Sequence, residues 1–166
     1  MTDTSGPALT VEEFVEYCRT RAGLLSGHVE TMGAEADDLL DEIDEEMAEV
    51  RSRLEDHAKG LERTDGPPTA TGPNPDEAAL EAIEDLERDL ERKQALVDAT
   101  QARMRAFQDL ASRYTDLAEE LAERVDDGHD ALTRVLEFEA DADAPAYFEE
   151  ETVLEAALEA RRSDGE

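Results

Sequence analysis

Apolar side chains recur every three or four residues through the first third of the chain, which is the spacing of one helix face. Thr10 precedes this pattern as a helix N-cap, and Glu13 completes a capping box with it. The sequence therefore predicts a disordered lead over residues 1–9 and one long helix over residues 10–63. The expected seam runs through Phe14, Cys18, Ala22, Leu25, Val29, Met32, Ala36, Leu40, Ile43, Met47, Val50, Leu54, His57 and Leu61.

A second apolar pattern, with intact heptads, predicts another long helix over residues 75–138. Asn74 is its expected N-cap and Pro75 occupies the first helical position. The Asp-Asp-Gly sequence that ends at Gly128 resembles a stop. Leu132 and Val135 nevertheless continue the apolar phase, so the helix is expected to pass through Gly128 and to end near Phe138.

Proline and glycine are concentrated in residues 64–74, between these two segments, and predict a loop. Two helices of similar length joined by one loop favour an antiparallel arrangement. The predicted fold class is therefore all-α, built on a long antiparallel coiled-coil helical hairpin.

A third, shorter helix is expected near the C-terminus. Residues 139–162 are predicted to form a turn and then a helix capped by Thr152 with Glu155. This helix should pack at the open end of the hairpin, and residues 163–166 should form a disordered tail.

Two polar residues, Lys93 and Thr100, occupy successive positions of one heptad seam. Polar seam residues often fix register. Lys93 is expected to face the region of Met47 and to reach Asp44 or Glu46, and Lys93→Leu is expected to raise stability while loosening the register.

Leu132, Val135, Leu136 and Phe138 are expected to extend beyond the start of the first helix and to be covered by the C-terminal segment. Leu96, Leu110 and Leu117 lie one position before the seam and widen the apolar face of the second helix beyond the needs of a two-stranded coil. We expect a second copy of the chain, giving a dimeric four-helix bundle, in preference to an unrelated protein. The candidate interaction residues are Leu96, Leu110, Leu117, Leu132, Val135, Leu136 and Phe138.

The charge balance is strongly acidic, with 46 Asp and Glu against 16 Lys and Arg and a net charge of −30. Lys59 and Lys93 are the only lysines. This composition resembles that of cytoplasmic proteins of haloarchaea, which implies work in concentrated potassium chloride. No apolar run of membrane-spanning length or signal-peptide pattern is present, so a cytoplasmic location without membrane contact is expected. Direct nucleic-acid binding would need a basic surface and is not expected.

The sequence offers little for catalysis. Metal-binding helical bundles use Glu-x-x-His pairs, but Leu25, Leu54 and Asp126 lie three residues before the three histidines. No glycine-rich phosphate loop and no CxxC motif is present, and the single cysteine, Cys18, excludes an intramolecular disulfide. We therefore expect no enzyme activity, no cofactor and no metal.

The favoured function is a non-catalytic coiled-coil interaction or scaffold protein. One alternative is a holdase chaperone that resembles the prefoldin family, whose members are also helical hairpins. Here PPTATGPNP lies between the helices in place of the strands by which prefoldins assemble. Another alternative is an acidic regulator of a nucleic-acid-binding protein.

Overall fold

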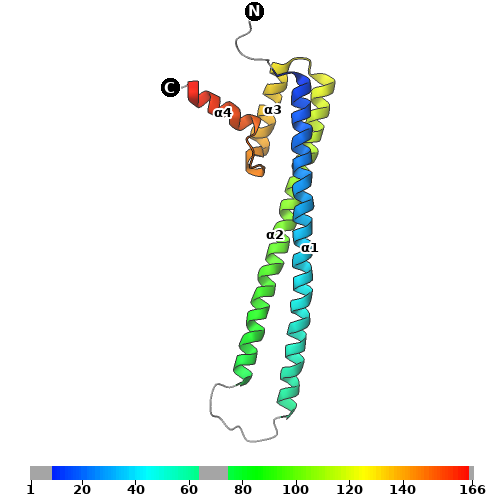
Figure 1. Cartoon of the computed structure of the whole chain (residues 1–166), viewed down its shortest axis with the longest axis vertical. Coiled ribbons are helices and arrows are strands. Elements are labelled where there is room, and N and C mark those ends of the chain that lie inside the picture. Colours follow the sequence, from blue (N-terminus) through cyan, green and yellow to red (C-terminus); the bar gives the residue numbers. More distant parts are fainter. Residues whose placement is uncertain (1–8, 64–74, 165–166) are drawn as a thin grey trace, which may run out of the picture. The chain divides into compact units, whose positions relative to one another are not determined.

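Four α-helices and one short 3₁₀ helix make up the regular structure of the computed structural model, which describes residues 9–63 and 75–164. Within those residues no strand occurs. The helices, in chain order, are α1 (Val11–Arg63), α2 (Pro75–Arg124), α3 (Gly128–Ala142), η1 (Ala144–Tyr147) and α4 (Val153–Asp164) (Figure 1).

The long helices α1 and α2 pack against each other, which confirms the predicted all-α helical hairpin with a short C-terminal helix. The start of α1 follows from the capping signal, because Thr10 Oγ1 accepts a hydrogen bond from the Glu13 amide at 3.2 Å. The predicted loop at 64–74 and residues 1–8 of the predicted lead lie outside the described residues, as do residues 165–166.

The prediction of one helix over residues 75–138 is wrong, because α2 ends at Arg124 and a separate helix, α3, begins at Gly128. Asp127 starts the new helix. Its backbone is extended, with φ −117° and ψ 132°, and its side chain accepts a hydrogen bond from the His129 amide at 3.3 Å. Asp126, Asp127 and Gly128 therefore act as a stop and a restart.

Gly128 is required by a close backbone approach. A Cβ atom at this position would lie 2.1 Å from the carbonyl oxygen of Leu9. Glycine lacks this atom, so the start of α3 can pass directly over the backbone that leads into α1. The chain reverses direction between α2 and α3, although the apolar spacing of Leu132 and Val135 matches that of α2.

The C-terminal part also differs in its boundaries from the prediction. Residues 139–142 belong to α3, and the turn comes later, at Asp143, whose φ of 54° is left-handed. The predicted cap of α4 is confirmed, since the Glu155 amide donates to Thr152 Oγ1 at 3.2 Å and the Thr152 amide donates to Glu155 Oε1 at 3.3 Å. The helix continues to Asp164, so residues 163–164 are helical and not a disordered tail.

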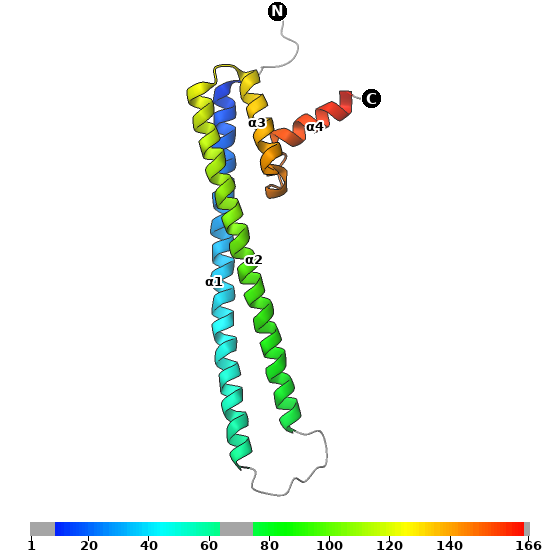
Figure 2. The ribbon, with the colours of Figure 1, turned by 180° about the vertical axis from the view of Figure 1, so that it is seen from behind.

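The chain divides into two compact units. Unit 1 comprises Met1–Thr31 and Met104–Glu166, and unit 2 comprises Met32–Arg103. In unit 1, α3 lies beside the segments of α1 and α2, while α4 points away from them (Figures 1 and 2). Its core is rich in aromatic and aliphatic side chains: Phe14, Leu25, Phe107, Leu110, Tyr114, Leu117, Leu121 and Val135 are all buried.

Unit 2 has a thinner core. It consists of one segment of α1 and one of α2, and its buried apolar residues are Met32, Ala36, Ile43, Ile83 and Val97. No aromatic residue contributes to this core within the described part of the unit.

Candidate functional site

The third layer of unit 1 is α3, which covers one face of α2. The Arg113 guanidinium lies 5.3 Å from the centre of the Phe138 ring, and Arg134 of α3 forms an ion pair with Glu120. Leu110 and Leu117 lie on the same face of α2 as Arg113 and Glu120, because all four recur at spacings of three and four residues. They are 2% and 7% exposed. The extra layer that these leucines predicted is supplied by the chain itself.

A buried carboxylate organises this unit. Glu139 of α3 is fully buried, and its Oε2 accepts hydrogen bonds from the hydroxyls of Tyr17 at 2.7 Å and Tyr114 at 2.6 Å. Its Oε1 accepts the amide of Leu154 at 3.0 Å. One carboxylate therefore links α1, α2, α3 and the start of α4. Buried charges persist when they are fully hydrogen-bonded in this way.

Arg21 fastens the segment that leads into α4. Its guanidinium lies 4.7 Å from the Phe148 ring centre and 5.0 Å from that of Tyr17, and its Nη2 donates to the Glu151 carbonyl at 2.8 Å. Tyr17 adds a contact of its own, since its hydroxyl accepts the Val153 amide at 3.0 Å. The first turn of α4 is thus held by side chains of α1 and α3.

Burial raises the pKa of the acidic side chains that lie next to Glu139. Desolvation, followed by the hydrogen bond to Glu139, raises the pKa of Tyr17 and of Tyr114 above 10.0. Desolvation also raises the pKa of the Cys18 thiol to about 12, and the nearby charge of Glu139 adds to this shift. These groups are protonated at neutral pH. Such a cluster is suited to holding structure together and offers no ionised nucleophile.

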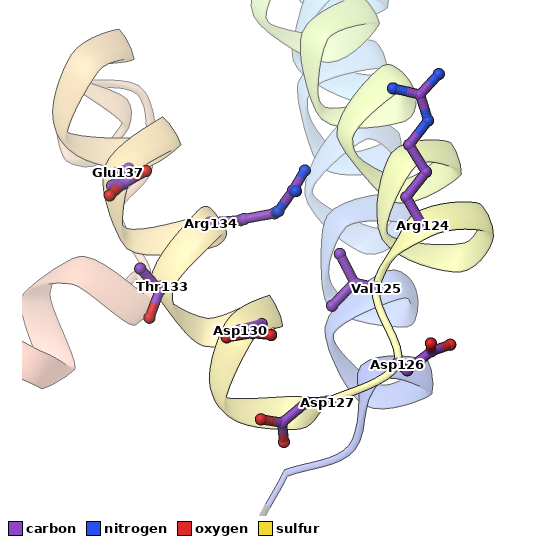
Figure 3. A pocket seen from close by; sticks show the side chains of 8 residues that line it. All are labelled: Arg124, Val125, Asp126, Asp127, Asp130, Thr133, Arg134 and Glu137. Atoms are coloured by element: carbon purple, nitrogen blue, oxygen red, sulfur yellow. The ribbon is translucent and has the colours of Figure 1, made fainter.

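A cleft of about 420 Å³ lies between the end of α2 and α3 (Figure 3). Arg134 extends from α3 toward α2, while Asp126 and Asp127 lie on the connecting segment (Figure 3). The single hydroxyl in its lining, that of Thr133, donates to the His129 carbonyl at 3.1 Å. The lining therefore mixes opposite charges without pairing a nucleophile with a base. Its residues are Arg124, Val125, Asp126, Asp127, Asp130, Thr133, Arg134 and Glu137.

In unit 2, Lys93 lies among three carboxylates. Its Nζ donates to Glu46 Oε1, lies 3.3 Å from Asp89 Oδ2 and 3.9 Å from Glu42 Oε2. The hydrogen bond to Glu46 is the main cause that raises the pKa of Lys93. Lys93 was expected to reach Asp44 or Glu46, and it reaches Glu46. Thr100, the other predicted register residue, is half-buried.

The seam of α1 shifts by one residue in unit 2. Leu39 and Glu46 are half-buried, whereas Leu40 is 42% and Met47 is 38% exposed. The regular alternation of steps of four and three selects Met32, Ala36, Leu39, Ile43, Glu46 and Val50. The predicted seam was therefore wrong at Leu40 and Met47, where Leu39 and Glu46 occupy the seam instead.

Large apolar side chains remain exposed along unit 2 as a result. On α1 they recur every seven residues, so they lie on one face of the helix. Two more, from α2, are exposed to a similar extent. The exposed fractions are 42% for Leu40, 38% for Met47, 45% for Leu54, 44% for Leu80 and 48% for Leu96. The face of α1 that carries Leu40, Met47 and Leu54 is the candidate interaction site.

The interaction residues predicted from sequence divide into three groups by exposure. Leu96 is exposed, whereas Leu110, Leu117 and Val135 are buried in unit 1 and offer no surface to a partner in this structure. The remaining three, Leu132, Leu136 and Phe138, are half-buried.

Sequence reasoning missed the burial of Glu139 and its hydrogen bonds. One signal was available, because Glu139 follows Val135 by four residues and so continues the buried face of α3.

No helix in residues 9–63 or 75–164 is long and apolar enough to cross a membrane. Among the same residues, no group of three or more His, Cys, Asp and Glu side chains is arranged to hold a metal ion. No protein-family model matches the chain, and no curated protein and no solved structure shows significant similarity to it.

Proposed function

We propose that this protein is a non-catalytic interaction protein that self-associates through unit 2 and works in a salt-rich cytoplasm. The observation that carries the proposal is a row of exposed apolar side chains on one face of α1 in unit 2. Leu40, Met47 and Leu54 are 42%, 38% and 45% exposed there.

Several exposed apolar side chains on one face contribute together to the free energy of association. Single exposed leucines are common on protein surfaces, but a row with helical spacing has a shared direction. Covering the exposed half of each side chain is worth roughly 1 kcal/mol. The three on this face of α1 together would contribute on the order of 3 kcal/mol to association, before the cost of bringing two chains together.

The absence of paired catalytic groups in the cleft of unit 1 also supports a non-catalytic role. Glu139 is fully buried, and its carboxylate oxygens are occupied by three donors. Catalytic acids and bases need access to a substrate. We therefore assign this cluster to the structure of unit 1.

Light scattering of the purified chain in molar potassium chloride tests the proposal. A mass of twice the 18.3 kDa of one chain is expected at micromolar concentration. A mass of one chain across the accessible concentration range would exclude self-association. Copurification of a different protein in stoichiometric amount would replace the second copy with that partner.

The exposed leucines also suit a holdase, which binds the apolar segments of unfolded proteins. An aggregation assay in molar salt, with a salt-tolerant client enzyme, separates this candidate from the first. Suppression of aggregation that disappears in Met47→Glu would favour the holdase. Unchanged aggregation would leave self-association as the role of the apolar face.

A further inference from the structure

We infer that unit 2 pairs with unit 2 of a second copy through one face of α1, antiparallel and centred on Met47. The inference rests on the proposed self-association and names the surface that would perform it. Five exposed residues form this face, which we call the Met47 face. They follow one another in steps of four and three, as in a helix–helix seam: Leu40, Asp44, Met47, Arg51 and Leu54.

The order of charges on the Met47 face is self-complementary. Asp44 precedes Met47 by three residues and Arg51 follows it by four. If a second α1 runs antiparallel about a two-fold axis at Met47, Asp44 of each copy faces Arg51 of the other. Parallel pairing would instead set Asp44 against Asp44 and Arg51 against Arg51. Like charges directly opposite each other disfavour that arrangement.

The apolar residues match in the same antiparallel register. Leu40 of each copy meets Leu54 of the other, and the two Met47 side chains meet at the axis. Methionine is unbranched and flexible, so two of them can fill an irregular central gap. A two-fold interface requires this kind of self-matching surface.

Asp44 and Arg51 are available for such contacts. Neither forms an ion pair with any other residue in the described ranges, whereas the nearby Arg53 pairs with Glu49 at 3.0 Å. Both side chains are exposed, so their charges can pair with groups of opposite sign on another chain. A second copy supplies both signs in the required order, which an unrelated protein would do only by chance.

Disulfide formation tests the geometry directly. Cys18 is buried, and its replacement by Ala provides a background without cysteine. In that background, Met47→Cys should give a covalent dimer on mild oxidation in molar potassium chloride, because a disulfide needs Cα atoms about 4.4–6.8 Å apart. Leu96→Cys is the matched control. This residue is also an exposed leucine, at 48%, but it lies on α2 outside the Met47 face, and it should remain monomeric on denaturing gels.

Association measurements test the chemistry of the face. Met47→Glu should weaken dimerisation by about 30-fold or more, since it places two carboxylates at the axis. Asp44→Arg and Arg51→Asp should each weaken it by about tenfold at the lowest salt that keeps the chain folded. The double variant restores the opposite charges and should return within about threefold of the parent chain.

The outcomes separate this inference from the broader proposal. A monomeric parent chain would overturn both. A dimer that keeps its mass in Met47→Glu, or that cross-links through Leu96→Cys and not through Met47→Cys, would leave self-association intact and overturn the Met47 face. Circular dichroism of each variant establishes that its helices are formed before association is compared.

Discussion

At the scale of single residues, Glu139 has the most extensive role in unit 1. A carboxylate without solvent contact is tolerable because two tyrosine hydroxyls and one backbone amide donate to it. The two hydroxyls and the amide in turn rely on Glu139 as their hydrogen-bond acceptor. Removal of the carboxylate would leave the buried Tyr114 hydroxyl, and the half-buried Tyr17 and Leu154 donors, without this acceptor.

We therefore predict that Glu139→Ala lowers the free energy of unfolding by about 3 kcal/mol. Denaturant titration in molar potassium chloride measures this change. Glu137→Ala is the matched control, because Glu137 lies on the same helix and is exposed, and its effect should stay within about 0.5 kcal/mol. Equal effects of the two substitutions would show that the Glu139 hydrogen bonds contribute nothing net.

The buried acids next to Glu139 give the stability of unit 1 a dependence on alkaline pH. The pKa values of Tyr17, Tyr114 and Cys18 are raised in the folded chain, so the folded state binds their protons more tightly than the unfolded state. Their contribution is complete below the unfolded values of 9.0 for the thiol and 10.0 for the phenols. It is lost as pH rises toward the folded values, about 12 for Cys18.

The expected result is a free energy of unfolding that falls steadily above about pH 9. Denaturant titrations at a series of alkaline pH values measure it. Tyr114→Phe cannot lose this phenolic proton and should reduce the slope above pH 10. A slope that is identical in Tyr114→Phe and in the parent chain would contradict the assignment.

The residues of this cluster could be predicted only in part from sequence. Phe14 and Cys18 were expected on the seam of the first helix and are buried, because helical spacing indicates a face whatever packs on it. The bonds to Glu139 could not be predicted. They join residues far apart in the chain, and an isolated glutamate in an acidic sequence is most often a solvated one.

At the scale of helices, signals that act within a few residues predicted where helices begin. Contacts between residues far apart in the chain could not be predicted. Thr10 and Thr152 were expected to cap helices and do so, because a capping box involves four consecutive residues. The break between α2 and α3 had a local signal in Asp126, Asp127 and Gly128, but the apolar phase of Leu132 and Val135 favoured a continuous helix. Met47 was misassigned to the seam of α1, because the position belongs to Glu46, which pairs with the distant Lys93.

Substitution of Gly128 tests the close approach between α3 and Leu9, and substitution of Gly27 is a control that should change the free energy of unfolding in the opposite direction. Gly128→Ala should lower the free energy of unfolding by about 1–3 kcal/mol, because its Cβ atom would overlap the Leu9 carbonyl. Gly27→Ala should raise it by about 0.5–1 kcal/mol, since no atom lies within 4 Å of the added Cβ atom and alanine favours helix. Thermal unfolding in molar salt measures both. Stabilisation by both substitutions would mean that Leu9 moves away at little cost.

At the scale of the whole molecule, the net charge of −30 opposes the folded state wherever salt does not screen it. The Debye length is about 3 Å at 1 M salt and about 10 Å at 0.1 M. Dilution therefore lets carboxylates on neighbouring turns repel one another. Each unit must resist this repulsion with its own buried contacts, and the two units differ greatly in what they bury.

We predict that dialysis into dilute buffer reduces helicity and that the loss begins in unit 2. Unit 1 retains an aromatic core and the bonds to Glu139, whereas unit 2 has one layer of aliphatic contacts and a lysine that faces three carboxylates. Circular dichroism measures the total change, and hydrogen exchange at decreasing salt locates it. Amides of Met32–Arg103 should lose protection at higher salt than those of Met104–Arg124. A loss of protection at the same salt concentration along the whole of α2 would indicate that the two units unfold as one, and an unchanged spectrum would remove the case for salt adaptation.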